Sequence, residues 1–137
     1  MPALPSSLAP DDATVAAKMP QRVLGRTGAS VSILAMGCGS RFLMYPAEEA
    51  TAVLEKAVGL GINYLDTAVN YGDGESETRL GRFLTTRRKD VFLATKVPGR
   101  ARTRDAALKE VEGSLKRLQT DHLDLLHLHS LGDEADL

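Results

Sequence analysis

Four short apolar segments recur along this chain at a nearly constant interval, and this spacing limits what the chain can fold into. The segments end at Gly37, Asp66, Lys96 and His129, which lie 29, 30 and 33 residues apart. A strand, a helix and the return to a parallel strand take about 30 residues. Right-handed crossovers bring successive strands side by side in one parallel sheet. The spacing therefore predicts an α/β fold built from repeated strand–helix units.

The stretches between these strand ends have the periodicity of amphipathic helices. Pro46, followed by Glu48 and Glu49, is typical of a helix start, because acids suit the positive end of the helix dipole. Thr103 is a candidate cap for a later helix. A hairpin is predicted first, because two apolar stretches flank a turn at residues 25–28. The expected elements are the hairpin 22–34, strands 32–39, 62–68, 91–97 and 122–129, and helices 46–58, 75–86 and 103–118.

Length and composition predict one folded domain with a short leader. A chain of 137 residues with 43% hydrophobic content fits one ordinary globular domain. Four of the six prolines fall within the first 20 residues, among alanine, serine and aspartate. Such a segment buries too little apolar surface to fold. We therefore predict a flexible leader over residues 1–20 and a folded domain over residues 21–137.

The charge balance narrows the classes of partner. A formal net charge of −1 argues against nucleic acid or an anionic membrane surface. No apolar run approaches the roughly 20 residues that span a bilayer. The single cysteine, Cys38, suits a reducing compartment, so we expect a cytoplasmic protein in which Cys38 is a small buried residue. The basic residues at positions 87–89, 100, 102 and 104 are expected to form solvated faces.

Strand parity brings three polar side chains to one place. Side chains alternate between the two faces of a strand, so Asp66 shares a face with Tyr64 while Leu65 faces the helices. The same count puts Lys96 and His129 on the inward face of their strands. Polar groups at the carboxyl ends of parallel strands suit both a (β/α)8 barrel and an open doubly wound sheet. Gly37-Cys-Gly39 could begin the G-x-G-x-x-G pattern of a dinucleotide-binding sheet, but the third glycine is absent. Its absence favours the barrel.

Several motifs in order resemble segments of the aldo-keto reductases. Between residues 21 and 131 they are Leu24-Gly-Arg-Thr-Gly28, Ala35-Met-Gly-Cys-Gly39, Asp66-Thr-Ala with Tyr71-Gly-Asp-Gly-Glu-Ser-Glu77, Ala94-Thr-Lys96 and Asp124-Leu-Leu-His-Leu-His129. The resemblance implies the N-terminal half of a TIM barrel, and an enzyme that reduces aldehydes or ketones with NADPH. Its implied partner is a small-molecule carbonyl substrate.

The resemblance also implies roles for individual residues. Tyr71 is the expected general acid, and the cation of Lys96 favours the phenolate that remains. Asp66 is expected to pair with Lys96, and His129 to orient the carbonyl oxygen by a hydrogen bond. Gly37 and Asp66 are expected at the cofactor. No metal is expected, because the pair His127/His129 lacks a third ligand.

Other interpretations of the same residues remain open. Asp66 and Lys96 also fit a structural ion pair, Tyr71 an ordinary loop tyrosine, and His129 a histidine bonded to backbone. A complete barrel needs about 250 residues, so we expect a truncated or fragmentary reductase with exposed sheet edges. Self-association or a complementing C-terminal half would cover those edges. A non-catalytic regulatory protein on the same fold is the alternative function.

Overall fold

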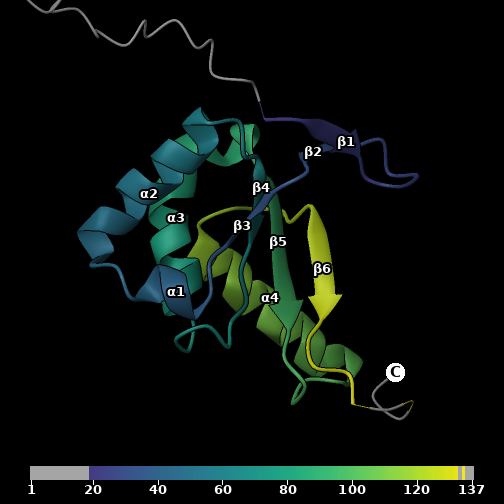
Figure 1. Ribbon diagram of the computed structural model, residues 1–137. Coiled ribbons are helices and arrows are strands. Elements are labelled where there is room, and N and C mark those ends of the chain that lie inside the picture. Colours follow the sequence, from purple (N-terminus) through teal and green to yellow (C-terminus); the bar gives the residue numbers. More distant parts are fainter. Residues whose placement is uncertain (1–18, 133, 135–137) are drawn as a thin grey trace, which may run out of the picture.

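The computed structural model describes residues 19–132 and residue 134, and Figure 1 shows its secondary structure. The predicted leader therefore lies outside the described residues, apart from Met19 and Pro20, and the domain limits stay a prediction. The elements in chain order are β1 (Gln21–Val23), β2 (Ser30–Ser32), β3 (Ala35–Gly37), α1 (Ser40–Leu43), α2 (Ala47–Gly59), β4 (Tyr64–Asp66), α3 (Glu75–Arg87), the 3-10 helix η1 (Arg88–Asp90), β5 (Phe92–Val97), α4 (Arg104–Leu118) and β6 (Leu125–Leu128).

A parallel four-stranded sheet organises the described part of the chain. Its strand order is β3-β4-β5-β6, and each neighbouring pair is parallel (Figure 1). The register pairs Gly37 with Asp66 and Asp66 with Ala94, so the carboxyl ends of these strands lie at one edge. The order shows no reversal among these four strands. A doubly wound sheet binds its ligand where the order reverses, so this order favours a barrel wall.

The predicted hairpin is present at the opposite end of the sheet. Strands β1 and β2 pair antiparallel, and Gly25 and Gly28 adopt the positive φ values of 52° and 77° that the turn requires. The side chain of Asn63 accepts a hydrogen bond from Ser32 N at 2.7 Å and donates to Ser30 O at 3.0 Å. Asn63 therefore fastens the hairpin to the start of β4.

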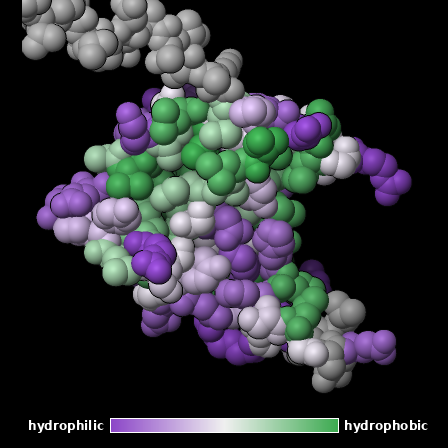
Figure 2. Space-filling model, viewed as in Figure 1, coloured by the Kyte–Doolittle hydropathy of each residue, from purple (hydrophilic) through white to green (hydrophobic). Residues whose placement is uncertain are grey.

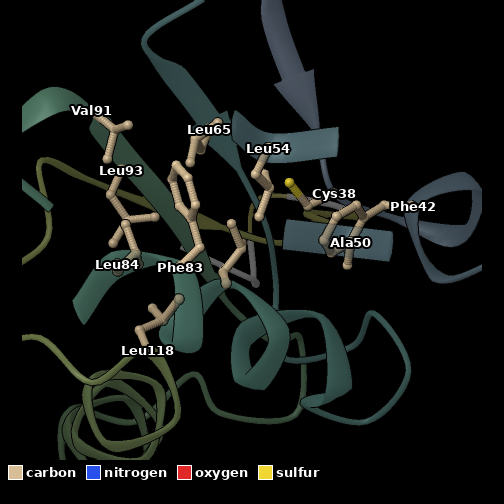
Figure 3. Close-up of a cluster of buried hydrophobic side chains, with 11 residues drawn as sticks. Cys38, Phe42, Ala50, Leu54, Leu65, Phe83, Leu84, Val91, Leu93 and Leu118 are labelled. Carbon is tan, nitrogen blue, oxygen red and sulfur yellow. The ribbon is translucent and has the colours of Figure 1, made fainter. Parts of the chain in front are cut away.

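The core lies between the sheet and the helices α2, α3 and α4. Leu65 of β4 and Leu93 of β5 point from the sheet into this layer, and Phe83 and Leu84 of α3 meet them (Figure 3). These four side chains are at most 1% exposed. Cys38 belongs to the same cluster, as expected for a small buried residue. The remaining buried members are Phe42, Ala50, Leu54, Leu80, Val91 and Leu118.

Three local expectations differ from the structure. The expected strand 32–39 is two short strands, with Ile33 and Leu34 exposed between them. The last strand begins at Leu125 and not at His122, because the carboxylate of Asp124 accepts the hydrogen bond from Leu93 N that a backbone carbonyl would otherwise take. The short helix α1 was not expected, and it buries Phe42.

The basic residues were expected to form solvated faces, and this is wrong for Arg102, which is partly buried and donates to His129 O, and for Arg88. The guanidinium of Arg88 donates to Asp124 Oδ2 at 2.7 Å, to Val91 O and to Thr120 Oγ1, so it ties η1 to the start of β6. A planar group with five donors suits such a junction of several acceptors.

The face of the molecule seen in Figure 2 is divided by polarity. Figure 2 shows hydrophobic side chains gathered over the end that carries the hairpin, where Val23, Ile33 and Leu34 are exposed. Within the described residues, no helix is long and apolar enough to cross a bilayer.

Candidate functional site

The carboxyl ends of β4, β5 and β6 bring the predicted site residues together. Asp66 is the last residue of β4, Lys96 the fifth of the six residues of β5, and His129 follows β6 directly. Their neighbours Leu65 and Thr95 are fully buried on the helix side of the sheet. The alternation predicted from parity therefore holds for β4 and β5. Polar groups thus emerge on the face that the helices leave open.

Lys96 is the centre of the polar contacts. Its Nζ donates to Asp66 Oδ1 at 2.5 Å, to Thr67 O at 2.9 Å and to the hydroxyl oxygen of Tyr71 at 3.2 Å. These three bonds use all three donors of an ammonium group. Its side chain is 13% exposed and that of Asp66 is 27% exposed, so the pair is shielded from water on most sides. Lys96 is thus oriented by its acceptors.

A tight loop delivers Tyr71 to the ammonium. Gly72, Asp73 and Gly74 have φ values of 66°, 52° and 90°, a left-handed run that reverses the chain before α3. A side chain at position 72 would lie 2.7 Å from Leu43 Cδ1, so α1 packs directly on the loop. The backbone of Tyr71 is held at both ends, because its N–H donates to Ala68 O and its carbonyl accepts from Ser76 N.

His129 packs against the Tyr71 ring. The two rings meet edge to face, with centroids 5.9 Å apart and an interplanar angle of 89°. His129 N donates to Val97 O at 2.9 Å, and Arg102 Nη2 donates to His129 O at 2.5 Å. Burial, followed by the charge of Lys96, lowers the pKa of His129 below its usual value. The imidazole is therefore neutral at neutral pH.

One ring nitrogen of His129 has no hydrogen-bond partner within the described residues. This nitrogen, Nδ1, is buried. Leaving a buried polar atom unpaired costs free energy, and such atoms in proteins usually find a partner. A neutral imidazole has one donating and one accepting nitrogen. His129 thus keeps a hydrogen-bonding capacity that the described residues do not use.

Glycines keep the surface beside Asp66 open. A Cβ built on Gly37 would have no atom within 4 Å, and Gly37 pairs with Asp66 in the sheet register. A Cβ on Gly39 would lie 3.7 Å from the Tyr71 ring, which is ordinary contact. Both predicted cofactor residues, Gly37 and Asp66, therefore border open space at the same strand edge.

Two other ionisable side chains near the site keep their protons at neutral pH. Burial, reinforced by the charge of Asp66, raises the pKa of Cys38 to about 12, so the thiol keeps its proton. Tyr64 packs edge to face on Phe92 with ring centroids 5.1 Å apart. Burial and the charge of Asp66 also raise the pKa of Tyr64. Tyr71 is the tyrosine that contacts the ammonium.

A buried polar network behind the site was not foreseen from the sequence. Glu77 is fully buried, and its carboxylate is bonded by Thr95 and Arg117. A signal was present, because Glu77 falls on the same helical face as Leu80 and Leu84, three and seven residues later. A carboxylate on an apolar stripe indicates a buried partner.

The arrangement combines a proton donor, a cation and a neutral imidazole around one open surface. Lys96 donates to the phenol oxygen of Tyr71, so the proton of that phenol remains free for another acceptor. No group of three side chains suited to holding a metal ion occurs in residues 19–132 or at 134. A surface hollow of about 500 Å³ lies elsewhere, lined by residues between 112 and 121, and contacts none of the four site residues.

Comparison with known proteins adds family relationships. The profile of the Aldo/keto reductase family matches residues 35–136. L-galactose dehydrogenase from Arabidopsis thaliana is 37% identical over 125 residues, which cover 83% of this chain and 39% of that protein. The holo form of an aldo-keto reductase from Bacillus halodurans superposes with a TM-score of 0.71 at 38% identity, covering 86% of this chain and 43% of that one.

A second solved structure resembles the chain to a similar degree. An aldo/keto reductase from Klebsiella pneumoniae, in complex with NADP and acetate, gives a TM-score of 0.69 at 30% identity over 78% of this chain and 38% of that one. The chain spans about two fifths of the length of these relatives. The matches confirm the predicted α/β units as part of a TIM barrel, and the doubly wound alternative is wrong.

Proposed function

Because this chain belongs to the aldo/keto reductase family, we propose that it carries the catalytic residues of an NADPH-dependent reductase of aldehydes and ketones. The observation that supports this proposal most directly is the set of three hydrogen bonds from Lys96 Nζ. A purely structural ion pair would need Asp66 alone. The third donor reaches the hydroxyl of Tyr71, a group that a packing role leaves unexplained.

In the proposed reaction Tyr71 gives its proton to the carbonyl oxygen of the substrate. The oxygen of Tyr71 accepts a hydrogen bond from Lys96 at 3.2 Å, so the tyrosine proton points to another acceptor. As that proton leaves, negative charge builds on the phenol oxygen, and the adjacent ammonium stabilises it. Asp66 holds the ammonium in place through a charge-assisted hydrogen bond.

His129 has a different proposed role. Its ring packs perpendicular to the ring of Tyr71, and its pKa is lowered by burial and by Lys96, so it is neutral. A neutral imidazole donates one hydrogen bond without competing for the proton that Tyr71 transfers. We assign His129 to orienting the carbonyl oxygen.

The residues present fit the reacting end of a nicotinamide cofactor. Gly37 leaves open space beside Asp66, and the buried Nδ1 of His129 has no partner in the described residues. Gly37 and Asp66 would border the cofactor, which supplies the hydride when bound. The Klebsiella relative was crystallised with NADP, which supports this cofactor for the present chain.

The partners of the chain follow from the same proposal. A small-molecule carbonyl compound is the substrate, and a cytoplasmic location stays a prediction. The chain covers 39% of its relative L-galactose dehydrogenase, and we propose self-association or a complementing C-terminal half as its protein partners. The alternative, a regulatory protein without catalysis, does not account for the contact between Lys96 and the Tyr71 hydroxyl.

The proposal is tested first by NADPH binding. The purified 137-residue chain is titrated with NADPH by fluorescence while its mass in solution is measured, and reductase turnover is assayed with a panel of aldehydes and ketones. The assays are repeated after adding the C-terminal half of a relative. Saturable binding with turnover, alone or complemented, is expected. No turnover under either condition would contradict the enzymatic proposal and favour the regulatory alternative.

A further inference from the structure

The first turn of α3 buries a carboxylate directly behind the candidate site. The side chain of Glu77 has no exposed surface. Its Oε1 accepts a hydrogen bond from Thr95 Oγ1 at 2.6 Å, and its Oε2 accepts one from Arg117 Nε at 2.7 Å. A buried carboxylate is costly unless it is paired and hydrogen-bonded. Both oxygens of Glu77 are satisfied, each by a different element of the fold.

Thr95 connects this carboxylate to the site. It directly precedes Lys96 in β5, and neighbouring side chains in a strand point to opposite faces. Thr95 therefore faces α3, while Lys96 faces Asp66 and Tyr71. A hydrogen bond to Thr95 restrains the strand segment whose other side carries the ammonium.

Ser76 makes a parallel connection to the neighbouring strands. Its hydroxyl donates to Cys38 O at 2.6 Å and lies 2.8 Å from Thr67 Oγ1. Because a serine hydroxyl has one proton, Thr67 is the donor in the second bond. Thr67 directly follows Asp66 in the chain, and Ser76 N donates to Tyr71 O. The first turn of α3 thus contacts the segments that carry Asp66, Lys96 and Tyr71.

We propose that Glu77 is a positioning residue: with Arg117 as its counter-ion, it holds Lys96 within reach of Asp66 and the Tyr71 hydroxyl. A carboxylate is suited to this place because its two oxygens accept from two donors at once. A glutamine has one acceptor oxygen, and its NH₂ group would face a donor. The effect of Glu77 on turnover rests on the proposed function, whereas its effect on the position of Lys96 does not.

The positioning is tested by NMR on the full chain. Wild-type protein should show a nuclear Overhauser effect between the side-chain methylene next to the Lys96 nitrogen and the Tyr71 ring, since Nζ lies 4.7 Å from the ring centroid. In Glu77→Gln we expect this effect to disappear while those within the core around Phe83 remain. Glu75→Gln is the matched control, because Glu75 lies in the same turn but is exposed and pairs with Arg79. It should leave both sets unchanged.

A second variant covers the case in which Glu77→Gln does not fold. Thr95→Val keeps the shape of the side chain and removes the hydroxyl that donates to Glu77. It should also lose the contact between Lys96 and Tyr71 while the core is retained. A folded Glu77→Gln or Thr95→Val protein with this contact intact would overturn the proposal. Unfolding of both variants would do the same, because Glu77 would then maintain the fold as a whole.

Kinetics provide a readout that stability alone would not move. In whichever form the wild type is active, Glu77→Gln should lower kcat by about 10- to 100-fold with KM little changed, because small misplacements of a catalytic group have effects of that size. Active-site titration measures the fraction of folded enzyme, so that a loss of folded protein is not mistaken for a lower kcat. Absence of wild-type turnover would count against the proposed function alone, since the NMR result decides the role of Glu77 independently.

Discussion

The ammonium of Lys96 lies against the ring of Tyr71, 4.7 Å from its centroid, and donates to its hydroxyl oxygen at 3.2 Å. The other two donors of Lys96 are taken by Asp66 Oδ1 and Thr67 O. The phenol therefore accepts from the ammonium and keeps its own proton to donate. A tyrosine that accepts from a cation and can still donate its own proton is suited to act as an acid catalyst, whereas a tyrosine that only packs needs no such hydrogen bond.

Tyr71→Phe tests this assignment with the smallest change. The variant keeps the ring that contacts His129 and removes only the hydroxyl. Loss of a general acid should lower kcat by about 10²- to 10⁴-fold with NADPH affinity unchanged. Steady-state kinetics and NADPH titration of the active form measure both quantities. Tyr45→Phe is the control, because Tyr45 is exposed and lies outside the site. Full activity in Tyr71→Phe would remove Tyr71 from the mechanism.

Lys96→Met removes the charge and keeps most of the side-chain volume. Asp66 then loses its charged partner, so we expect a loss of stability of about 1–3 kcal/mol and strongly reduced turnover. Urea unfolding followed by circular dichroism gives the first quantity, and reductase assays give the second. Lys89→Met is the matched control, since Lys89 is exposed in η1. Equal effects of the two substitutions would contradict a special role for Lys96.

The interval between strand ends and the alternation within strands predicted both the sheet and the convergence of Asp66, Lys96 and His129. Such patterns are local, because they depend on residues within one strand or one helical turn. The network around Glu77 was not predicted, because its partner Arg117 lies 40 residues away and is chosen by the packing of α3 on α4. The role of Arg88 was missed for the same reason, since two of its acceptors, His122 O and Asp124 Oδ2, lie more than 30 residues away, just before β6.

The close approach of α3 and α4 depends on Gly81. A Cβ at this position would lie 2.2 Å from the backbone oxygen of Arg117, which cannot turn away as a side chain would. Gly81→Ala should therefore destabilise the fold by about 1–3 kcal/mol or more, as overpacking of cores does. Gly59→Ala in α2 is the control, because a Cβ there meets no atom within 4 Å. It should be neutral or stabilising by up to about 1 kcal/mol.

The two glycine variants are compared by thermal and urea unfolding. If Gly81→Ala is as stable as Gly59→Ala, α3 and α4 do not cross at this distance in solution. Because Arg117 also bonds Glu77, a shift of α4 in Gly81→Ala should weaken that buried pair as well.

His129 should make stability depend on pH in a defined window. Its pKa in the folded chain is lowered, first by burial and then by Lys96, from the ordinary value of 6.5. As the pH falls from about 6.5 toward this lower pKa, the unfolded chain binds a proton before the folded chain does. Stability should therefore decrease over this window and be independent of this group above it.

The pH effect is measured by urea unfolding between pH 8 and pH 5. His129→Asn should flatten the decrease, and His122→Asn is the control, because His122 is exposed and lies outside the site. A decrease of the same size in His129→Asn would assign it to other groups.

The last strand presents an apolar face that the described part of the chain does not cover. Leu126 and Leu128 of β6 are 44% and 47% exposed, and among residues 19–132 β6 pairs only with β5. Exposed apolar edge strands promote association. The isolated chain should therefore gain mass with concentration in sedimentation experiments, and Leu126→Gln with Leu128→Gln should reduce this gain. Leu60→Gln, at an exposed site after α2, is the control. If the double variant associates as strongly as the wild-type chain, the contact between copies lies elsewhere. A C-terminal half that restores activity should then bind the wild-type chain and the double variant equally.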